Sequence, residues 1–182
     1  FLTELNSKTS KIKLLEQGKL EQIKGIVNLS SELEPKEVGE RVKSAAESSL
    51  KRFNVPINIR VEYARSLCPG GEMVLWSIFS MHGKVDPDNP VILGSDALLE
   101  RNKTSEQVGK EAAEKLAREI DAVKVVDEHL LDQLIPFMGL LPGSEISAKE
   151  INSHAQTNIH IVEQFLPVKF KVSNGKISVQ TQ

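Results

Sequence analysis

One histidine of this chain stands in the segment SHAQTN, where its neighbours could support nucleophilic chemistry. Asn152 or Ser153 can cap a helix here, which places His154 in the first helical turn. Thr157 and Asn158 follow at i+3 and i+4, so they share its face. A helix N-terminus attracts phosphate and disfavours an imidazolium, so we expect a neutral imidazole able to attack a phosphoryl group. Taken alone, the spacing favours a plainer interpretation, a capping or surface histidine.

A second set of polar residues lies on a strongly apolar segment that Asp127 is expected to cap as a helix. His129, Asp132 and Gln133 are spaced i, i+3 and i+4 and therefore share one face. Charged and amide groups within such an apolar helix are costly unless they are paired. The spacing predicts either a binding site or the polar surface stripe of a core helix, and it does not choose between them.

The composition excludes several classes of protein. The chain has 182 residues, of which 40% are hydrophobic, and this is enough for a folded core. Aromatic residues make up 4% and the net charge is -2, which argues against a stacking surface for single strands and a general nucleic-acid coat. A single cysteine, Cys68, excludes an internal disulfide and a multi-cysteine zinc site, so we expect a cytoplasmic location. No apolar run approaches the ~20 residues of a membrane span.

Hydrophobic periodicity predicts an α/β unit over residues 23–119. We expect strands near 24–29, 57–63, 73–79 and 91–93, and amphipathic helices over 35–53 and from Thr104 onward. Thr104 and Gln107 match a capping box. The segment CPGGE, residues 68–72, is interpreted as a hairpin turn, because it lacks the lysine of a phosphate-binding loop.

The remaining residues, 122–182, predict a second α/β layer. Two helices are expected over 125–141 and 151–167, with a short strand between them. A hairpin with an Asn-Gly turn at Asn174 and Gly175 should close the chain. The opening, residues 1–22, is interpreted as a strand followed by a loop. Because the first residue is Phe1, we expect the chain to be the C-terminal part of a longer protein.

These two helices carry a resemblance to a known family. VDEHLLDQLIPFMGLL followed by SHAQTNIHIVEQFLPVKF resembles the C-terminal part of the RNA 3'-terminal phosphate cyclases. GSDALLERNKTSEQVGKEAAEKL resembles the family stretch just before it. The match runs from about 91 to 170, and residues 23–90 resemble the inserted small domain of that family more weakly.

The resemblance implies a fold of α/β class, of the α+β type. It consists of repeated βαβαββ-like units, of the cyclase and enolpyruvyl-transferase kind, with an inserted four-stranded α/β domain. Residues 22–121 would form the insert, and residues 1–21 and 122–182 the last repeat of the large domain. The N-terminal half, with the phosphate-binding arginines and glutamate of the family, is not in this sequence. We therefore expect the chain alone not to catalyse.

The resemblance also implies an activity. Such enzymes are ATP-dependent ligases that convert the 3'-terminal phosphate of RNA into a 2',3'-cyclic phosphate, with Mg or Mn as divalent cation. An enzyme histidine first takes AMP, AMP passes to the RNA 3'-phosphate, and the neighbouring 2'-hydroxyl displaces it. The implied partners are ATP, RNA with a 3'-terminal phosphate and the N-terminal half of the same protein, with no membrane.

Carried onto this chain, the resemblance makes His154 the adenylylated nucleophile. His129 stands where bacterial and animal relatives place a tyrosine that stacks on adenine, and Asp132 is a candidate metal ligand. Nucleotide binding and support of the nucleophile fall to five residues: His129, Asp132, Gln133, Thr157 and Asn158.

Two alternatives stay open. One is a non-catalytic cyclase-like protein of ribosome assembly, whose relatives lack the histidine. The other is an enzyme like the enolpyruvyl transferases, which share the repeated architecture but form no covalent bond to a histidine. The presence of His154 argues against both.

Overall fold

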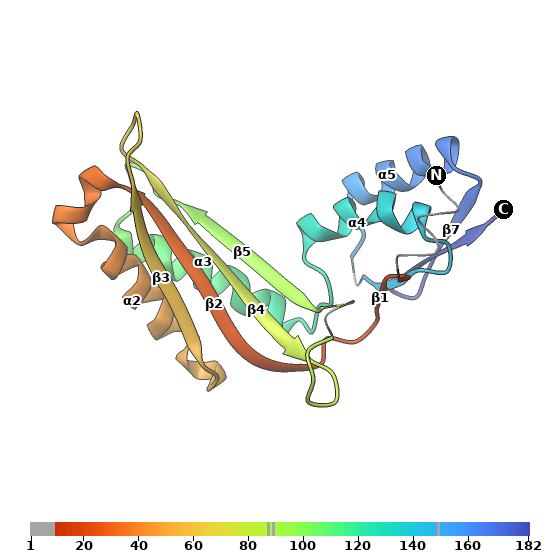
Figure 1. Ribbon diagram of the computed structural model, residues 1–182, viewed down its shortest axis with the longest axis horizontal. Coiled ribbons are helices and arrows are strands. Elements are labelled where there is room, and N and C mark those ends of the chain that lie inside the picture. The colour runs from red at the N-terminus through yellow and green to blue at the C-terminus, as the bar shows by residue number, and fades with distance from the viewer. Residues whose placement is uncertain (1–9, 87, 89, 149) are drawn as a thin grey trace. The chain divides into compact units, whose positions relative to one another are not determined.

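The chain divides into two compact units. The computed structural model describes residues 10–86, 88, 90–148 and 150–182. The first unit combines Phe1–Gly18, Ser80–Val91 and Val123–Gln182, and the second combines Lys19–Phe79 and Ile92–Ala122 (Figure 1). Of the strand and loop expected for residues 1–22, residues 1–9 lie outside the described residues. The described part contains the two-residue strand β1 (Lys13–Leu14) and, from Lys19, the start of a longer strand. The division falls near the boundaries of the expected insert, residues 22–121, except that Ser80–Val91 belongs to the first unit. The roles of the two units as insert and last repeat stay predictions.

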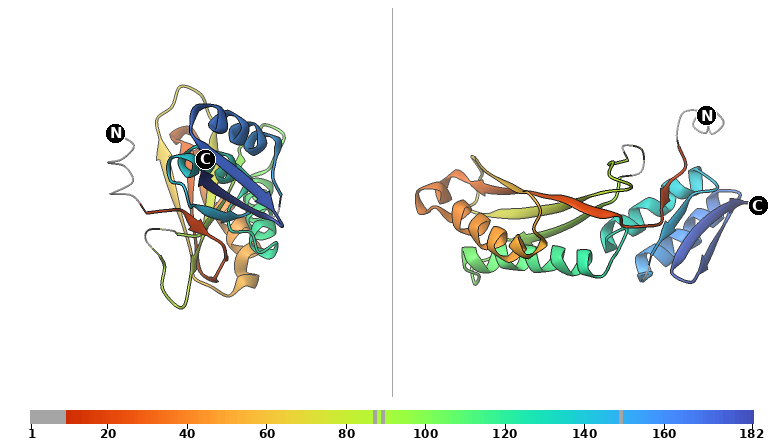
Figure 2. Two further views of the ribbon diagram at one scale, coloured as in Figure 1. Left: turned by 90° about the vertical axis from the view of Figure 1, so that its right-hand side faces the viewer. Right: turned by 90° about the horizontal axis from the view of Figure 1, so that it is seen from below.

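A four-stranded sheet forms the second unit. Its strands are β2 (Lys19–Ser30), β3 (Ile57–Ala64), β4 (Gly71–Ser80) and β5 (Ile92–Leu98), in the order β3-β2-β4-β5. The β2–β3 pair is parallel and the β4–β5 pair antiparallel. The α-helices α2 (Val38–Leu50) and α3 (Ser105–Asp121) pack together and cover one face of this sheet (Figure 2). The expected α/β unit is confirmed, with β2 and β5 longer than predicted.

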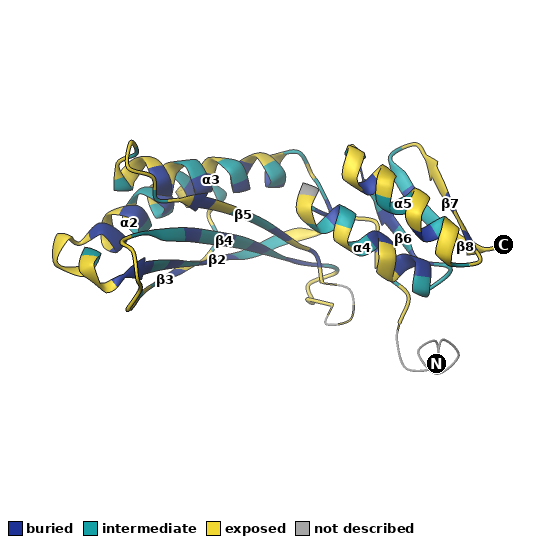
Figure 3. Ribbon diagram, turned by 90° about the horizontal axis from the view of Figure 1, so that it is seen from above, coloured by how far each residue is buried: buried dark blue, intermediate teal, exposed yellow. Residues whose placement is uncertain are grey.

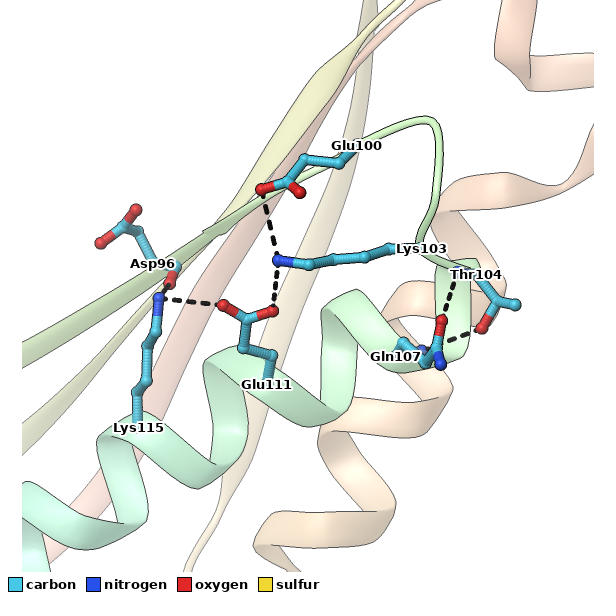
Figure 4. Close-up of polar contacts among 7 residues, drawn as sticks. All are labelled: Asp96, Glu100, Lys103, Thr104, Gln107, Glu111 and Lys115. Carbon is cyan, nitrogen blue, oxygen red and sulfur yellow. Dashed lines mark hydrogen bonds and ion pairs between the residues drawn. The ribbon is translucent and has the colours of Figure 1, made fainter.

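Local signals account for α3. Thr104 Oγ1 accepts from the Gln107 N–H at 3.2 Å, and Gln107 Oε1 accepts from the Thr104 N–H at 2.7 Å, so the predicted capping box is present (Figure 4). The predicted apolar stripe of α3 is buried: Val108, Ala112, Leu116 and Ile120. Ion pairs of Lys103 with Glu100 and Glu111 lie beside the start of the helix (Figure 4).

The single helix predicted over 35–53 is wrong at both ends. Residues Ser31–Lys36 form a 3₁₀ helix (η1) that contains Pro35, and α2 begins only at Val38. Glu37 lies between them with φ 52, a left-handed conformation that breaks a right-handed helix. After α2 the chain tightens again into a 3₁₀ turn, η2 (Lys51–Phe53).

The hairpin predicted for CPGGE is also wrong. The strands on either side of it, β3 and β4, are not neighbours, because β2 lies between them. The connection instead crosses the end of β2, where the Gly70 N–H donates to Ser30 Oγ at 3.1 Å and the Ser30 N–H donates to the Gly70 carbonyl at 2.9 Å. Sequence periodicity shows where strands lie but not which strands pair, so it could not exclude the hairpin.

The first unit contains the two helices of chemical interest. Its sheet has the order β1-β6-β8-β7, from β1 (Lys13–Leu14), β6 (Glu145–Ser147), β8 (Lys176–Thr181) and β7 (Val168–Ser173). The predicted helices are α4 (Glu128–Leu140) and α5 (Ser153–Phe165), which pack side by side (Figures 1 and 3). Asn174 and Gly175 have φ of 51 and 71 in the β7–β8 turn, as the Asn-Gly hairpin requires.

Candidate functional site

The first turn of α5 presents His154 to solvent. Asn152 is the capping residue: its Oδ1 accepts from the Ala155 N–H at 2.7 Å, which decides between the two caps considered. His154 and Thr157 are exposed. The Thr157 hydroxyl donates to the Ser153 carbonyl at 2.9 Å, within its own helix. The predicted position of the histidine, at the start of a capped helix, is therefore confirmed.

The second set lies at the start of α4. Asp127 caps this helix, with Oδ1 accepting from the N–H groups of His129 at 3.1 Å and Leu130 at 2.7 Å. His129 and Gln133 are exposed, while Asp132 is half-buried. The opposite side of the helix is core: Leu131, Ile135 and Met138 are buried. The polar residues thus lie at the edge of the core, on the solvent side of the helix.

Tertiary packing aligns the two helices. Asn158 Nδ2 donates to the main-chain carbonyl of Asp132 at 2.9 Å, which joins the second turn of α4 to the second turn of α5. Further along, a Cβ built on Gly139 would lie 2.4 Å from Val162 Cγ1, so the Val162 side chain of α5 packs directly against the backbone of α4 there. From the first contact to the second, the residue numbers rise along both helices. The helices therefore run parallel, and their N-terminal ends lie together.

This alignment brings the two predicted sets to one end of the helix pair. Asn158, expected only to support the nucleophile, also links the helices through the Asp132 carbonyl. The spacing could not reveal that role, because the partner of an amide side chain is a tertiary contact. The roles of all six residues as nucleophile, nucleotide ligands or supports stay predictions.

A small pocket opens between the N-terminal ends of these helices. It holds about 70 Å³ and is lined by the segment 123–127, by Leu131 and by Ser147, Ala148, Glu150 and Asn152. The Gln17 side chain donates to the Lys124 carbonyl at 2.9 Å and holds this segment. Pockets that enclose drug-sized ligands are several hundred Å³. This pocket is too small for a nucleotide, and none of the six predicted residues lines it. Sequence reasoning did not single out Ser147 or Glu150, which carry no motif.

The far end of α5 is anchored by a carboxylate. Glu163 Oε1 accepts from the Phe170 N–H at 2.8 Å, and Oε2 pairs with Lys169 on β7. The Lys169 ammonium and then the Phe170 N–H hold the pKa of Glu163 below its ordinary value. This carboxylate fixes the helix that carries His154 onto the sheet.

The described residues contain neither a metal-binding cluster nor a membrane-spanning helix. Among them, no group of three or more His, Cys, Asp or Glu side chains is arranged to hold a metal ion. The role of Asp132 as a metal ligand therefore stays a prediction, because the described residues place no such ligand group around it. In the part of the chain that the structure describes, no helix has the length and apolar character to cross a bilayer.

Comparison with known proteins places the chain in a family. Residues 15–121 match the family described as "RNA 3'-terminal phosphate cyclase (RTC), insert domain". Curated proteins named RNA 3'-terminal phosphate cyclase are similar over most of the chain. The protein of Pyrobaculum neutrophilum is 40% identical over 166 residues, covering 88% of this chain and 44% of the relative. That of Saccharolobus solfataricus is 36% identical over 176 residues, covering 97% and 49%.

The chain therefore belongs to the RNA 3'-terminal phosphate cyclase family, as the two helix motifs indicated. It spans about half the length of the curated relatives that it matches. The four-stranded sheet with α2 and α3 lies within the residues that match the insert domain. The helices α4 and α5 lie outside that match.

Proposed function

We propose that the protein of which this chain is a part converts an RNA 3'-terminal phosphate to a 2',3'-cyclic phosphate at the expense of ATP, through a histidine–AMP intermediate. The relatives carry the name of this activity. The observation that carries the proposal is the position of His154, exposed in the first turn of capped helix α5. Asp132 and Gln133 lie near the N-terminal end of the parallel helix α4, and therefore at the same end of the helix pair as His154.

The proposed chemistry begins with the imidazole of His154. Its ring nitrogen attacks the α-phosphorus of ATP, a P–N bond forms, and the P–O bond to pyrophosphate breaks. The N–H groups of the first turn and the positive helix end favour the negative charge on the bound AMP phosphate. An oxygen of the RNA 3'-phosphate then bonds to the AMP phosphorus, and the P–N bond to His154 breaks. The 2'-hydroxyl loses its proton and attacks the 3'-phosphorus, and AMP leaves as the cyclic ester closes.

The other predicted residues would bind the nucleotide. We assign the base and ribose of ATP to His129, Asp132 and Gln133, whose side chains start from the same end of the helix pair as His154. Thr157 and Asn158 hold the local backbone through bonds within and between the helices. The family resemblance implies Mg or Mn, but the described residues include no three-ligand cluster, so we assign the cation to no residue of this chain.

The remaining half of the protein belongs to this proposal. The chain spans less than half the length of the Pyrobaculum neutrophilum relative, and its small pocket cannot enclose a nucleotide. We propose that the N-terminal half completes the site and that the chain alone is inactive. A cytoplasmic location, expected from the single Cys68, stays a prediction.

The test measures label retained on intact protein after incubation with α-labelled ATP and magnesium or manganese. It uses a protein that joins this chain to the half of a relative that the chain does not match. His154→Ala and His154→Asn should both abolish the adduct and the cyclisation of RNA, because neither side chain can act as this nucleophile. The adduct should be labile in acid and stable in base, as a phosphoramidate is.

The matched control is His160→Ala, since His160 is exposed on the same helix but lies more than two turns beyond the cap. This variant should retain nearly all labelling. Label that survives in His154→Ala would reject the assignment of the nucleophile. Cyclisation without any adduct would reject the mechanism, and a folded protein with neither activity would favour a non-catalytic cyclase-like protein.

A further inference from the structure

Both helices of the second unit lie on the same face of its sheet, so the other face carries none of the helices described for this unit (Figure 2). Side chains alternate along each strand, and Ile23, Leu75 and Leu93 are among those buried beneath the helices. The even-numbered residues within 22–28, 58–64, 72–78 and 92–98 face the other way, and all of them are half-buried or exposed. We call the surface that they form the open face.

The two central strands, β2 and β4, run antiparallel, and two glycines define their register. A Cβ built on Gly25 would lie 2.6 Å from Leu75 Cδ2, and a Cβ built on Gly71 would lie 2.4 Å from Leu29 Cδ2. The residue number rises along β2 while it falls along β4, and both contacts fit the same register. This register fixes which residues of the two strands lie side by side on the open face.

One row of side chains crosses the open face from strand to strand. The register of the central strands sets Lys24 opposite Trp76. Lys24 is paired with Asn58 on β3, and Trp76 is paired with Gly94 on β5. Because Gly94 has no side chain, the position on β5 directly across from the indole leaves space beside its ring. The row thus sets a cation and an amide beside a half-buried indole.

Charge is distributed unevenly around this row. Arg60, two residues after Asn58 on β3, adds a second cation with a side chain that is 66% exposed. Its guanidinium lies 3.5 Å from the Glu62 carboxylate, but exposed pairs of this kind are weak and do not hold an arginine firmly. The carboxylates Glu62 and Glu72 lie further along β3 and at the start of β4. The half of the open face around Trp76 is therefore the half that suits an anionic ligand.

We propose that this half of the open face binds single-stranded RNA, with one base stacked on the Trp76 indole and phosphates near Lys24 and Arg60. Single strands are bound by aromatic rings that stack on bases and by cations along the backbone, and a four-stranded sheet is one platform that presents both. Gln22 and Asn58 add amides that can hydrogen-bond to base edges. The choice of RNA as the ligand rests on the proposed function, whereas the composition of the face does not.

A single tryptophan limits this contact to one stacked base. The 4% of aromatic residues argues against an extended stacking surface, and the open face is not one. Lys24 and Arg60 supply two cations, so the affinity should be modest and should depend weakly on salt. The face would thus hold part of an RNA strand rather than coat it.

The experiment follows the fluorescence of Trp76, the only tryptophan of this chain, during titration with RNA. The probe is a single strand of about eight nucleotides with a 3'-phosphate, at low salt. Stacking of a base on the indole should quench the fluorescence. The logarithm of the association constant should fall with the logarithm of the salt concentration with a slope of about −1.4, as expected for two cations on a single strand.

Variants separate the two contributions, with affinity measured by the anisotropy of labelled RNA. Trp76→Leu should weaken binding at least about fivefold, because it removes the stacking ring. Lys24→Gln should reduce the salt slope to about −0.7, because one cation remains. Lys110→Gln is the matched control, since Lys110 is exposed on α3 and not on the open face, and it should change neither quantity. Circular dichroism checks that Trp76→Leu is folded, and Lys24→Gln tests the proposal without altering the indole.

His154→Ala distinguishes this proposal from the proposed function. This variant of the chain should bind the probe as the native chain does, although the same change should abolish the AMP adduct in the joined protein. An adduct without quenching by RNA would overturn only the present proposal. Quenching without an adduct would overturn only the histidine–AMP mechanism.

Three results would count against RNA on the open face. The first is an affinity for the probe that is the same in Trp76→Leu and Lys24→Gln as in the control. The second is equal quenching by double-stranded RNA of the same length, because paired bases are not free to stack on the indole. The third is self-association of the chain that shields Trp76, detected by light scattering, which would assign the face to a second copy.

Discussion

At the scale of single residues, Glu163 shows how one carboxylate holds the candidate nucleophile in place. Its side chain is only 12% exposed, and it joins α5 to β7 through the Phe170 N–H and Lys169. Glu163→Gln removes the charge and should lower the free energy of unfolding by about 1–2 kcal/mol at pH 7, the difference between a hydrogen bond to a charged group and one to a neutral group. Urea unfolding measures this loss.

The pH dependence follows from the direction of the pKa shift. The pKa of Glu163 is lowered in the folded state, so the unfolded state binds the proton more readily. The stabilisation is therefore fully present above the unfolded pKa of about 4.3 and is lost as the pH falls through the lower, folded value. The stability difference between the native protein and Glu163→Gln should shrink over that range. A constant difference down to pH 2 would contradict this account.

At the scale of elements, α2 and α3 pack through a glycine. A Cβ built on Gly109 would lie 2.1 Å from the main-chain carbonyl oxygen of Val42, and backbone cannot move aside as a side chain can. Gly109→Ala should therefore destabilise the second unit by about 1–3 kcal/mol, despite the helix propensity of alanine. Thermal or urea unfolding measures the loss.

Gly70→Ala is the control for this prediction, because a Cβ built on Gly70 meets nothing within 4 Å. It should change the free energy of unfolding by less than about 0.5 kcal/mol. If Gly109→Ala proved as stable as Gly70→Ala, the close approach of α2 and α3 would be wrong.

At the scale of the whole molecule, the second unit has a core of its own. Residues from three of its strands and both helices are fully buried within it, among them Ile23, Val42, Leu75, Leu93 and Leu116, and Ile59 on the fourth strand, β3, is buried as well. We expect the fragment 19–122 to fold alone, because it contains both segments of the unit and the connection between them. Trp76 on β4 is the only tryptophan, so its fluorescence reports this unit selectively.

The fragment should unfold in a single cooperative urea transition, and Gly109→Ala should lower its midpoint. This measurement also tests the predicted insert boundaries. The fragment 19–122 begins a few residues before the predicted boundary at 22 and ends one residue after the predicted boundary at 121. A gradual loss of Trp76 fluorescence would mean that the unit depends on the rest of the chain.

The sequence by itself determined the local features of this protein. The caps of α3, α4 and α5, the Asn-Gly hairpin and the first-turn position of His154 depend on residues within about four positions of each other. Periodicity and capping rules read such contacts directly. The two helix motifs also identified the family, which the comparisons confirm.

Tertiary structure alone decided how those features combine. The place of β2 between β3 and β4 overturned a hairpin, and the left-handed conformation of Glu37 delayed the start of the helix predicted from residue 35. The bond from Asn158 to Asp132, 26 residues apart, and the contact of Val162 with Gly139 align the two candidate helices in parallel. Spacing along one helix defines a face but not what that face meets, because partners distant in sequence are chosen by packing and hydrogen bonding across the whole unit. For that reason the positions of the candidate residues on their own helices were predictable, and the alignment of the two helices was not.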